Sequence, residues 1–468
     1  MTTGTGGYVV AIDNGSQSTK VLIVDGEGAV HAHARVALRP YSSPAPGRWE
    51  HPDDDLWDSI VSAVRAALED FAGDPAEIRG LGLCTIRFCR AVLRADGSLA
   101  QPVMSWMDER LPRPYVRERE DAAFVTTSSG YIGHRLTGER RDAAGNVQGM
   151  WPIDTTAWTW SADPAEFART GLDPEMLFDL VAPGELLGTL TAEAAAATGL
   201  SEGIPVIATS NDKAVEALGA GLREESESLL SLGTYVATMT PGDRPLPPHP
   251  DVWTNFAAEP DRYLYESGGV RRGMWTVSWF RDLVSASSPG VSENDLNEGA
   301  AQVPVGAGGL VAVLDWLAPP DEPWRRGALV GFDGTQGRFH IHRAILEALA
   351  IETAVKEARA RAALGRPLEA VVVTGGGSGS RLMRKIVAAV YGVPVRTPRV
   401  SDAAGMGAAI CAAIGTGMHA SWDDAVAAMV HLDEEVAVDP DLQRGYAQVM
   451  RTHARVVPGI RRVFADEG

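Results

Sequence analysis

A carboxylate followed by a turn of small polar residues stands near the start of the chain. The segment Asp13-Asn14-Gly15-Ser16-Gln17-Ser18-Thr19-Lys20 follows an apolar, β-prone run. Backbone N–H groups and hydroxyls in such a turn can face an anion, so a phosphate would fit there. An ordinary hairpin with a polar turn explains the same residues. The segment is not the G-x-x-x-x-G-K-[ST] pattern, which disfavours a P-loop nucleotide hydrolase.

A second candidate turn is rich in glycine. The apolar run Val371 to Val373 leads into Thr374-Gly375-Gly376-Gly377-Ser378-Gly379-Ser380, and a helix is predicted over 382–391. Glycines before a helix allow a nucleotide to approach the backbone closely. A dinucleotide site is the rival, but the spacing is not G-x-G-x-x-G and no acidic residue follows about 20 positions later. An NAD-dependent enzyme is therefore the weaker alternative.

Asp212 is the third candidate. In Ser210-Asn211-Asp212-Lys213 it follows the strand-like run Ile204 to Ala208. Ser210 or Asn211 can cap a helix there, with Asp212 in the first turn, where the helix dipole favours the carboxylate form. Taken alone, the local sequence favours a helix-start aspartate without a chemical role, and only the combination with the two glycine-hydroxyl turns and the Gly375 turn raises a chemical one.

Alternating strands and helices must position these residues. The runs at 8–13 and 20–24 predict a β-hairpin around the first turn, and apolar residues at helical spacing predict a helix over 53–71. A second strand–turn–strand pattern at 229–240 pivots on Gly233-Thr234, again a glycine followed by a hydroxyl residue. The order predicts an α/β protein with layered sheets, and the two hairpins hint at an internal duplication.

Length and apolar content indicate more than one domain. A chain of 468 residues, 45% of them hydrophobic, fits two or three cores. We place the boundary near Gly219 to Leu222, which divides the chain into 1–221 and 222–468. The apolar run Ala403 to Gly415 is short of the roughly 20 residues of a membrane span and contains several glycines, so we predict a buried helix.

Charge and cysteine content narrow the class of partner. A net charge of −19 argues against nucleic acid and anionic lipid. The three cysteines include no C-x-x-C pair, so neither a disulfide framework nor a zinc site is indicated. Met1 to Gly7 lacks the basic start and apolar core of a signal peptide, and we therefore expect a cytoplasmic location.

Taken in order, these segments and several others resemble the FGGY family of carbohydrate kinases, within the actin-like ATPase superfamily. The resemblance spans nearly the whole chain and points to a poorly characterised branch. It is carried by Asp13 to Lys20, Gly82 to Leu93, Ala95 to Gly97, Trp106 to Arg110, Leu136 to Glu139, Asp212, Ser231 to Thr234, Arg326 to Ala328, Arg343 to Glu347, Gly375 to Gly377 and Gly405 to Ala409.

The resemblance implies a fold and a reaction. The fold would be two actin-like, ribonuclease H-like domains with a cleft between them. The N-terminal domain would bind sugar and phosphate, and the C-terminal domain would bind the nucleotide. The reaction would be phosphorylation of a hydroxyl of a sugar or polyol by ATP with Mg²⁺, in which positioning and charge neutralisation do most of the catalysis.

The resemblance also implies roles for individual residues. Asp212 would be the catalytic base, and Asp13 would act through Mg²⁺. The residues near ATP would be Ser16, Ser18, Lys20, Gly233, Thr234, Gly376, Gly377 and Ser380. The residues facing the substrate would be Arg87, Trp106, Asp108, Asp212 and Lys213.

Departures from the family pattern concern the substrate. The segment Thr85 to Arg90 keeps Arg87 but loses polar sugar ligands on both sides, and Lys213 follows the base where many members have an amide or a small residue. Arg87 and Lys213 would suit an anionic group, which makes a sugar acid an alternative to a neutral ketose. Pairing of these charges with carboxylates explains them equally well.

Two further expectations stay open. The segment between Arg110 and Leu136 is shorter than in the family, which would open the cleft, reshape the sugar site or expose a surface for a homodimer. An actin-like ATPase that serves as a binding or regulatory module, without a sugar acceptor, is the second class of function. A kinase needs Asp212 at the cleft, whereas such a module does not.

Overall fold

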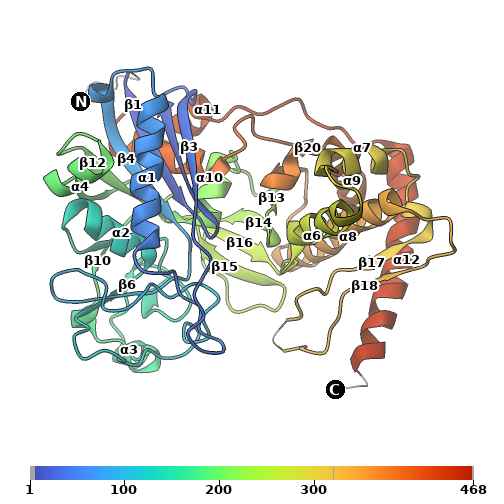
Figure 1. Cartoon of the computed structure of the whole chain (residues 1–468), viewed down its shortest axis with the longest axis horizontal. Coiled ribbons are helices and arrows are strands. Elements are labelled where there is room, and N and C mark those ends of the chain that lie inside the picture. Colours follow the sequence, from blue (N-terminus) through green and yellow to red (C-terminus); the bar gives the residue numbers. More distant parts are fainter. Residues whose placement is uncertain (1–5, 320, 466–468) are drawn as a thin grey trace.

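The computed structural model describes residues 6–319 and 321–465, which form two halves side by side (Figure 1). Each half is built on a six-stranded sheet. The first sheet has the spatial order β11 (Leu186–Thr189), β12 (Pro205–Asn211), β4 (Ile78–Thr85), β1 (Tyr8–Asn14), β2 (Ser18–Asp25) and β3 (Val30–Ala37). The second has the order β15 (Val252–Phe256), β16 (Tyr263–Ser267), β14 (Val236–Gly242), β13 (Glu227–Leu232), β19 (Ala370–Thr374) and β20 (Val395–Arg396).

The two sheets repeat one topology. In each, an antiparallel hairpin, β1–β2 or β13–β14, takes a third antiparallel strand on one side, β3 or β16. On the other side it takes two parallel strands, β4 and β12 or β19 and β20. The repeat explains why a glycine-hydroxyl turn occurs twice in the sequence. It defines two actin-like, ribonuclease H-like domains, as predicted.

Helices cover both sheets. The longer helices of the first half are α1 (Asp55–Asp70), α2 (Ser128–Thr137) and α5 (Asp212–Gly219), with short α3 (Pro164–Thr170) and α4 (Ala192–Thr198) beside them. Those of the second half are α6 (Gly273–Ser287), α7 (Glu293–Ala301), α8 (Arg338–Leu364), α9 (Arg381–Tyr391), α10 (Ala403–Gly415), α11 (Trp422–Met429) and α12 (Pro440–Ala465). Helix α1 packs on β2 and β3, and α8 contacts β14 and β16. No helix in the described part of the chain combines the length and apolar content that a membrane crossing requires.

Small two-stranded pairs complete each half. They join β5 (Ala91–Leu93) to β6 (Phe124–Thr126), β7 (Arg141–Ala143) to β10 (Asp179–Val181), β8 (Ile153–Asp154) to β9 (Thr159–Trp160) and β17 (Val311–Val313) to β18 (Ala328–Val330). Between Arg110 and β6 the chain forms no helix. This is the segment that the sequence marked as unusually short.

Helices α5 and α10 lie between the two sheets. One apolar cluster joins them to both, from Val9 and Ala11 of β1 to Leu229 of β13 and Val372 of β19. Helix α10 contacts β1, β2, β4 and β12, so a helix from the second half covers the first sheet. The apolar run 403–415 is therefore the buried helix that its composition predicted.

Two glycines allow α5 and α10 to approach each other closely. A Cβ added to Gly407 would lie 1.9 Å from the carbonyl oxygen of Val215, and one added to Gly219 would lie 1.9 Å from the carbonyl oxygen of Ala403. Because both obstacles are backbone atoms, neither can be relieved by a change of rotamer. The close contact of the helix backbones requires glycine at both positions.

We expect Gly407→Ala to lower the free energy of unfolding by about 2 kcal/mol or more, because the helices must separate to admit the methyl group. Thermal unfolding of the whole chain measures the effect. Gly459→Ala in α12 is the matched control, since nothing lies within 4 Å of its added Cβ. Alanine there should be neutral or stabilising by up to about 1 kcal/mol. Equal melting temperatures for the two variants would contradict the assigned contact.

Candidate active site

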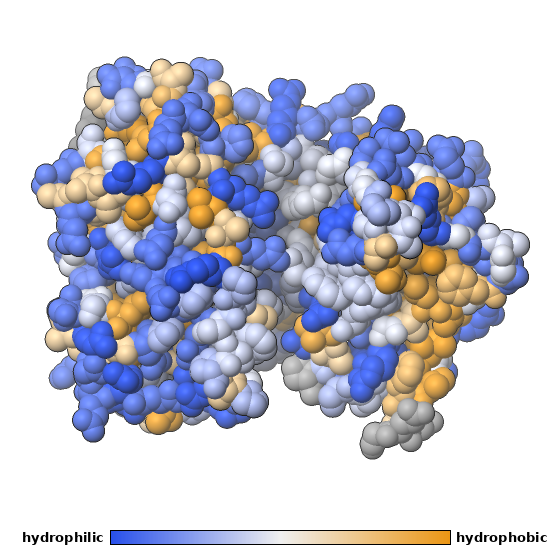
Figure 2. Space-filling view, viewed as in Figure 1, coloured by the Kyte–Doolittle hydropathy of each residue, from blue (hydrophilic) through white to orange (hydrophobic). Residues whose placement is uncertain are grey.

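The tips of the two hairpins meet between the halves. The side-chain amide of Gln17 donates a hydrogen bond to the hydroxyl of Thr234 over 3.2 Å, and both residues are exposed. Their neighbours Ser16 and Gly233 are partly exposed. Figure 2 shows the surface hollowed between the two halves. The structure thus brings together the two turns that the sequence singled out separately.

Lys20 lies between two carboxylates at the base of the first turn. Its ammonium is 3.0 Å from Asp13 Oδ2 and 3.3 Å from Asp402 Oδ1. Burial raises the pKa of Asp13 to about 6, and the charges of Asp402 and Asp212 add to this, although Lys20 opposes it. Burial lowers the pKa of Lys20, but the two carboxylates raise it by more, so the ammonium stays charged.

The two carboxylates beside Lys20 fit a magnesium ion in their chemistry. Mg²⁺ takes oxygen ligands and is usually held by one or two carboxylates, with waters and substrate phosphates completing the shell. A cation near Asp13 and Asp402 would relieve the like-charge repulsion that helps to raise the pKa of Asp13. Among the described residues no set of three or more His, Cys, Asp or Glu side chains forms a metal cage. The arrangement therefore suits an ion shared with phosphates.

The glycine turn after β19 packs tightly on one side and is open on the other. Gly375 has a φ of 78°, and a Cβ there would lie 2.6 Å from the carbonyl oxygen of Leu232. A Cβ on Gly377 would lie 3.0 Å from Leu232 and Met274. Gly376 has nothing within 4 Å of its Cβ position. The turn is therefore fixed against β13 while the exposed Gly376 leaves room for a ligand.

Asp212 begins α5 at the base of the hollow. Asn211 caps the helix by accepting the N–H of Ala214 over 3.1 Å, which confirms one of the two caps predicted. The Asp212 side chain keeps 26% of its surface exposed, and its Oδ1 is 3.7 Å from Arg87 Nε. The carboxylate is thus held in place by the helix start and remains reachable.

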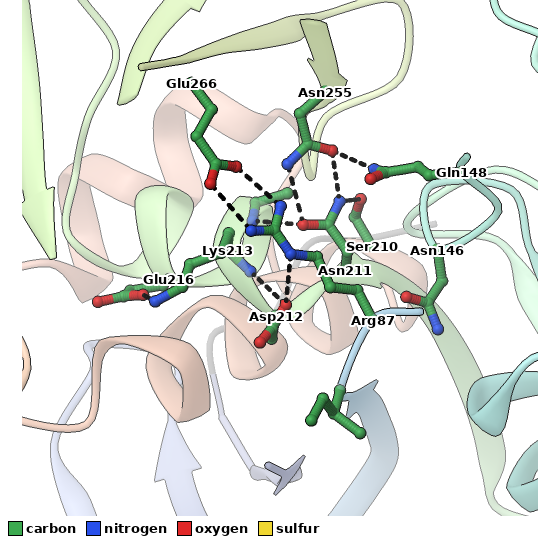
Figure 3. A network of polar contacts seen from close by, with 12 residues as sticks. Arg87, Asn146, Gln148, Ser210, Asn211, Asp212, Lys213, Glu216, Asn255 and Glu266 are labelled. Carbon is green, nitrogen blue, oxygen red and sulfur yellow. Dashed lines mark hydrogen bonds and ion pairs between the residues drawn. The ribbon is translucent and has the colours of Figure 1, made fainter. Parts of the chain in front are cut away.

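Arg87 joins the two halves (Figure 3). Its guanidinium donates two hydrogen bonds to Glu266 of β16, over 2.8 and 2.9 Å. It also lies 5.1 Å from the ring of Phe88 and 5.3 Å from that of Trp253. Phe88 has a φ of 63°, a left-handed conformation that is rare for a bulky residue and clusters at functional sites. Glu266 and Asp212 together neutralise the charge of Arg87.

The surroundings of Asp212 shift its titration. Burial raises the pKa of Asp212 above its ordinary value, and the charges of Glu216 and Glu266 act in the same direction, while Arg87 and Lys213 lower it. A carboxylate whose pKa is raised is a better proton acceptor than an ordinary aspartate. The site can therefore take a proton from a hydroxyl placed next to Asp212.

Lys213 is bound to the second sheet. Its ammonium is 2.8 Å from Glu216 Oε2 and 2.8 Å from Ser231 Oγ. Glu216 also accepts a hydrogen bond of 2.6 Å from Thr374. These contacts tie α5 to β13 and β19 directly beside Asp212. The ammonium of Lys213 is therefore already paired with a carboxylate of the protein.

Three other predicted ligand contacts are used by the fold itself. Asp108 has a side chain that is 0% exposed, and it accepts hydrogen bonds of 2.8 Å from Arg110 and from the N–H of Trp49. Ser18 accepts a 3.0 Å hydrogen bond from Arg35, and the hydroxyl of Ser380 caps α9. Their polar groups hold loops and a helix end. By contrast Trp106 is 43% exposed and free to meet a ligand.

Sequence reasoning missed Glu266, Asp402 and Trp253. Glu266 lies in the apolar strand segment Tyr263–Ser267, where a single carboxylate looks like an outward-facing residue of an edge strand. Asp402 caps α10 by accepting the N–H of Gly405, and that helix-start position was the one available signal. Their partners Arg87 and Lys20 are more than 170 residues distant in the sequence, so only the fold reveals the pairs.

The chain belongs to the FGGY family of carbohydrate kinases. The N-terminal domain of that family matches residues 8–115 and 113–219, and the C-terminal domain matches residues 229–416. The protein is therefore a carbohydrate kinase, a phosphotransferase that uses ATP, and its substrate is a small sugar-like molecule.

Relatives with different names match nine tenths or more of the chain. Uncharacterized sugar kinase YgcE of Escherichia coli (strain K12) is 42% identical over 435 residues, covering 91% of this chain and 88% of the relative. An autoinducer-2 kinase of Yersinia enterocolitica is 25% identical over 523 residues, covering 100% and 97%. The crystal structure of xylulose kinase from Rhodospirillum rubrum has a TM-score of 0.83 at 25% identity, covering 98% and 100%. The names agree on a kinase and differ in the molecule that is phosphorylated.

Removing the ammonium between Asp13 and Asp402 should destabilise the fold. We expect Lys20→Met to lower the free energy of unfolding by about 2 kcal/mol, less than for a fully buried pair because 35% of the Lys20 side chain is exposed. Adding Asp402→Asn should restore more than half of the loss, since asparagine still caps α10 but removes one of the two like charges. Urea unfolding of both variants measures this, and a larger loss in the double variant would contradict the pairing.

Proposed function

We propose that this kinase transfers the terminal phosphoryl group of ATP to a hydroxyl of a neutral sugar or polyol, with Asp212 as the general base. The observation that carries the proposal is the position of Asp212, at the start of α5 and in contact with Arg87. Its carboxylate is partly exposed and has a raised pKa. It accepts the hydroxyl proton as the bond to phosphorus forms.

The donor side is assigned to the two hairpin tips and the glycine turn. Ser16, Gly233 and Thr234 bind the phosphates, since their backbone N–H groups and hydroxyls lie at the meeting point of the halves. Gly376 and Gly377 line the place of the adenosine. Lys20 neutralises phosphate charge, and Asp13 with Asp402 holds Mg²⁺, which would polarise the phosphates. In this assignment residues 1–221 form the sugar and phosphate domain, and 222–468 form the nucleotide domain.

The charges around Asp212 favour a neutral substrate over a sugar acid. Arg87 is neutralised by Glu266 and Asp212, and Lys213 is neutralised by Glu216. A carboxylated substrate would have to displace one of these buried pairs, and breaking such a pair costs several kcal/mol. A neutral polyol instead takes hydrogen bonds from the Arg87 guanidinium and packs on Trp106. The pocket therefore selects hydroxyls.

An actin-like ATPase without a sugar acceptor is the alternative class. Such a module needs the hairpins and the glycine turn, but it has no need of a carboxylate with a raised pKa or of an arginine aimed at it from 3.7 Å. The pair Arg87 and Asp212 supports the kinase. Replacement of Asp212 tests directly whether this pair serves catalysis.

Asp212→Asn should reduce kcat by about 10²- to 10⁴-fold, because the amide keeps the shape and the helix start but cannot accept the proton. ATP turnover is measured with a panel of ketoses, polyols and sugar acids. Wild type should respond to a neutral member of the panel, whereas the variant should keep nucleotide binding and lose that response. Basal turnover that ignores every sugar would favour the ATPase module. A response confined to sugar acids would refute the neutral substrate and leave the base intact.

The pH dependence of kcat/KM should report the environment of Asp212. The carboxylate form is the active one, and its pKa is raised, so activity should fall on acidification at a pH above that of an ordinary aspartate. Glu266→Gln removes a charge that raises this pKa and should move the acid limb to lower pH. Arg87→Gln removes the charge that lowers it most and should move the limb to higher pH. Shifts in the same direction for both variants would contradict the role of Asp212.

A further inference from the structure

A cavity of about 540 Å³ lies in the second half, apart from the residues assigned to sugar and ATP. It is bounded by the segment 268–271 that follows β16, the loop after β17, the middle of α8 and the C-terminal part of α12. Its size is in the range of pockets that hold small organic molecules. One wall is apolar and includes Leu314, Ile351, Val355, Met450 and Val457.

The lining of the cavity also carries an excess of positive charge. Five of its lining residues are basic, and two are acidic, Asp315 and Glu352. Arg461 forms ion pairs with both carboxylates, at 2.7 Å from Asp315 and 3.2 Å from Glu352.

Three of the basic lining residues lack a counter-ion. Arg271, Lys356 and Arg359 form no ion pair with any carboxylate in the described part of the chain. Arg271 instead donates to the carbonyl of Ala318, and Lys356 donates to the carbonyl of Gly269. Burial lowers the pKa of Lys356, and the charges of Arg461 and Arg325 add to this, while Glu352 and Asp315 oppose it without reversing it. The cavity therefore has more basic than acidic lining residues, and three of the basic ones form no ion pair within the described residues.

Buried polar atoms on the cavity wall are also left without partners. His453 is 6% exposed, and its Nε2 makes no hydrogen bond, nor does Nε of Arg325. Native proteins pair nearly all such groups, so an unpaired one at a cavity points to a ligand that completes it.

We propose that this cavity is a second ligand site, which binds a small organic anion bearing a phosphate or carboxylate group. The anionic group pairs with Lys356, Arg359 and Arg271. The carbon skeleton lies on the apolar wall. The site is separate from the cleft that contains Asp212, and its occupancy does not rest on the proposed function.

The same cavity is connected to the cleft through one segment of chain. Lys356 holds the carbonyl of Gly269, whose N–H donates to Tyr235 over 3.0 Å. Glu266, the partner of Arg87, lies three residues before Gly269. An anion that draws Lys356 away from that carbonyl loosens the segment beside Arg87. We therefore expect the bound anion to change KM for the sugar.

Calorimetric titration of the whole chain tests the site. Inorganic phosphate, glucose 6-phosphate and citrate are each titrated in the presence of a saturating non-hydrolysable ATP analogue, which blocks the phosphate sites of the cleft. We expect saturable binding of at least one organic anion, weakened about tenfold or more by Lys356→Met and by Arg359→Ala. Arg338→Ala, on the same helix but outside the cavity, should bind as wild type does. The phosphate and carboxylate arms identify the favoured group.

Two results would overturn the proposal. One is the absence of saturable binding for all three anions. The other is binding that Lys356→Met and Arg359→Ala leave unchanged, which would place the anion elsewhere. Arg359→Ala removes a charge that makes no ion pair within the described residues, so its loss of binding cannot be attributed to a broken internal pair. Circular dichroism of each variant confirms that it is folded.

Discussion

The close crossing of α5 and α10 is the contact on which the active site depends. Gly219 and Gly407 let the two helix backbones touch between the sheets, where side chains of any size would separate them. Asp212 begins one of these helices, and Asp402 caps the other. Both carboxylates influence the pKa of Asp13. The contact between the two helix backbones thus sets the spacing of Asp13, Asp212 and Asp402, which come from distant parts of the chain.

Electrostatic pairing then defines what each charged group can do. Lys20 is shared by two carboxylates, Arg87 by two more, and Lys213 is bound to Glu216. The cations near Asp212 are therefore already paired within the protein, which is one of the two explanations that the sequence allowed. What stays open for chemistry is a carboxylate with a raised pKa, the exposed hairpin tips and the face of Gly376.

The sequence predicted the elements better than the contacts. Hairpins, the buried helix at 403–415 and the cap of α5 follow from local patterns of apolar residues, glycines and helix-start residues, and all three are present. The sequence did not reveal the internal contacts of Asp108, Ser18 and Lys213, because a polar side chain near a site looks the same whether it binds a ligand or holds a loop. Glu266 escaped notice because its partner Arg87 belongs to the other half of the chain. Information of that kind is present in the fold and not in any short segment.

The position of α10 has a consequence for how the protein acquires its structure. This helix follows the last strand of the second sheet, yet it covers β1 and β4 of the first. The two halves repeat one topology, but they are not two independent folding units. A ribosome that has released only the first 221 residues has produced a sheet with one apolar face covered by α5 but still without α10. That face stays incompletely covered until nearly the whole chain has been synthesised, so chaperone demand and aggregation during synthesis should depend on the arrival of a helix more than 180 residues later.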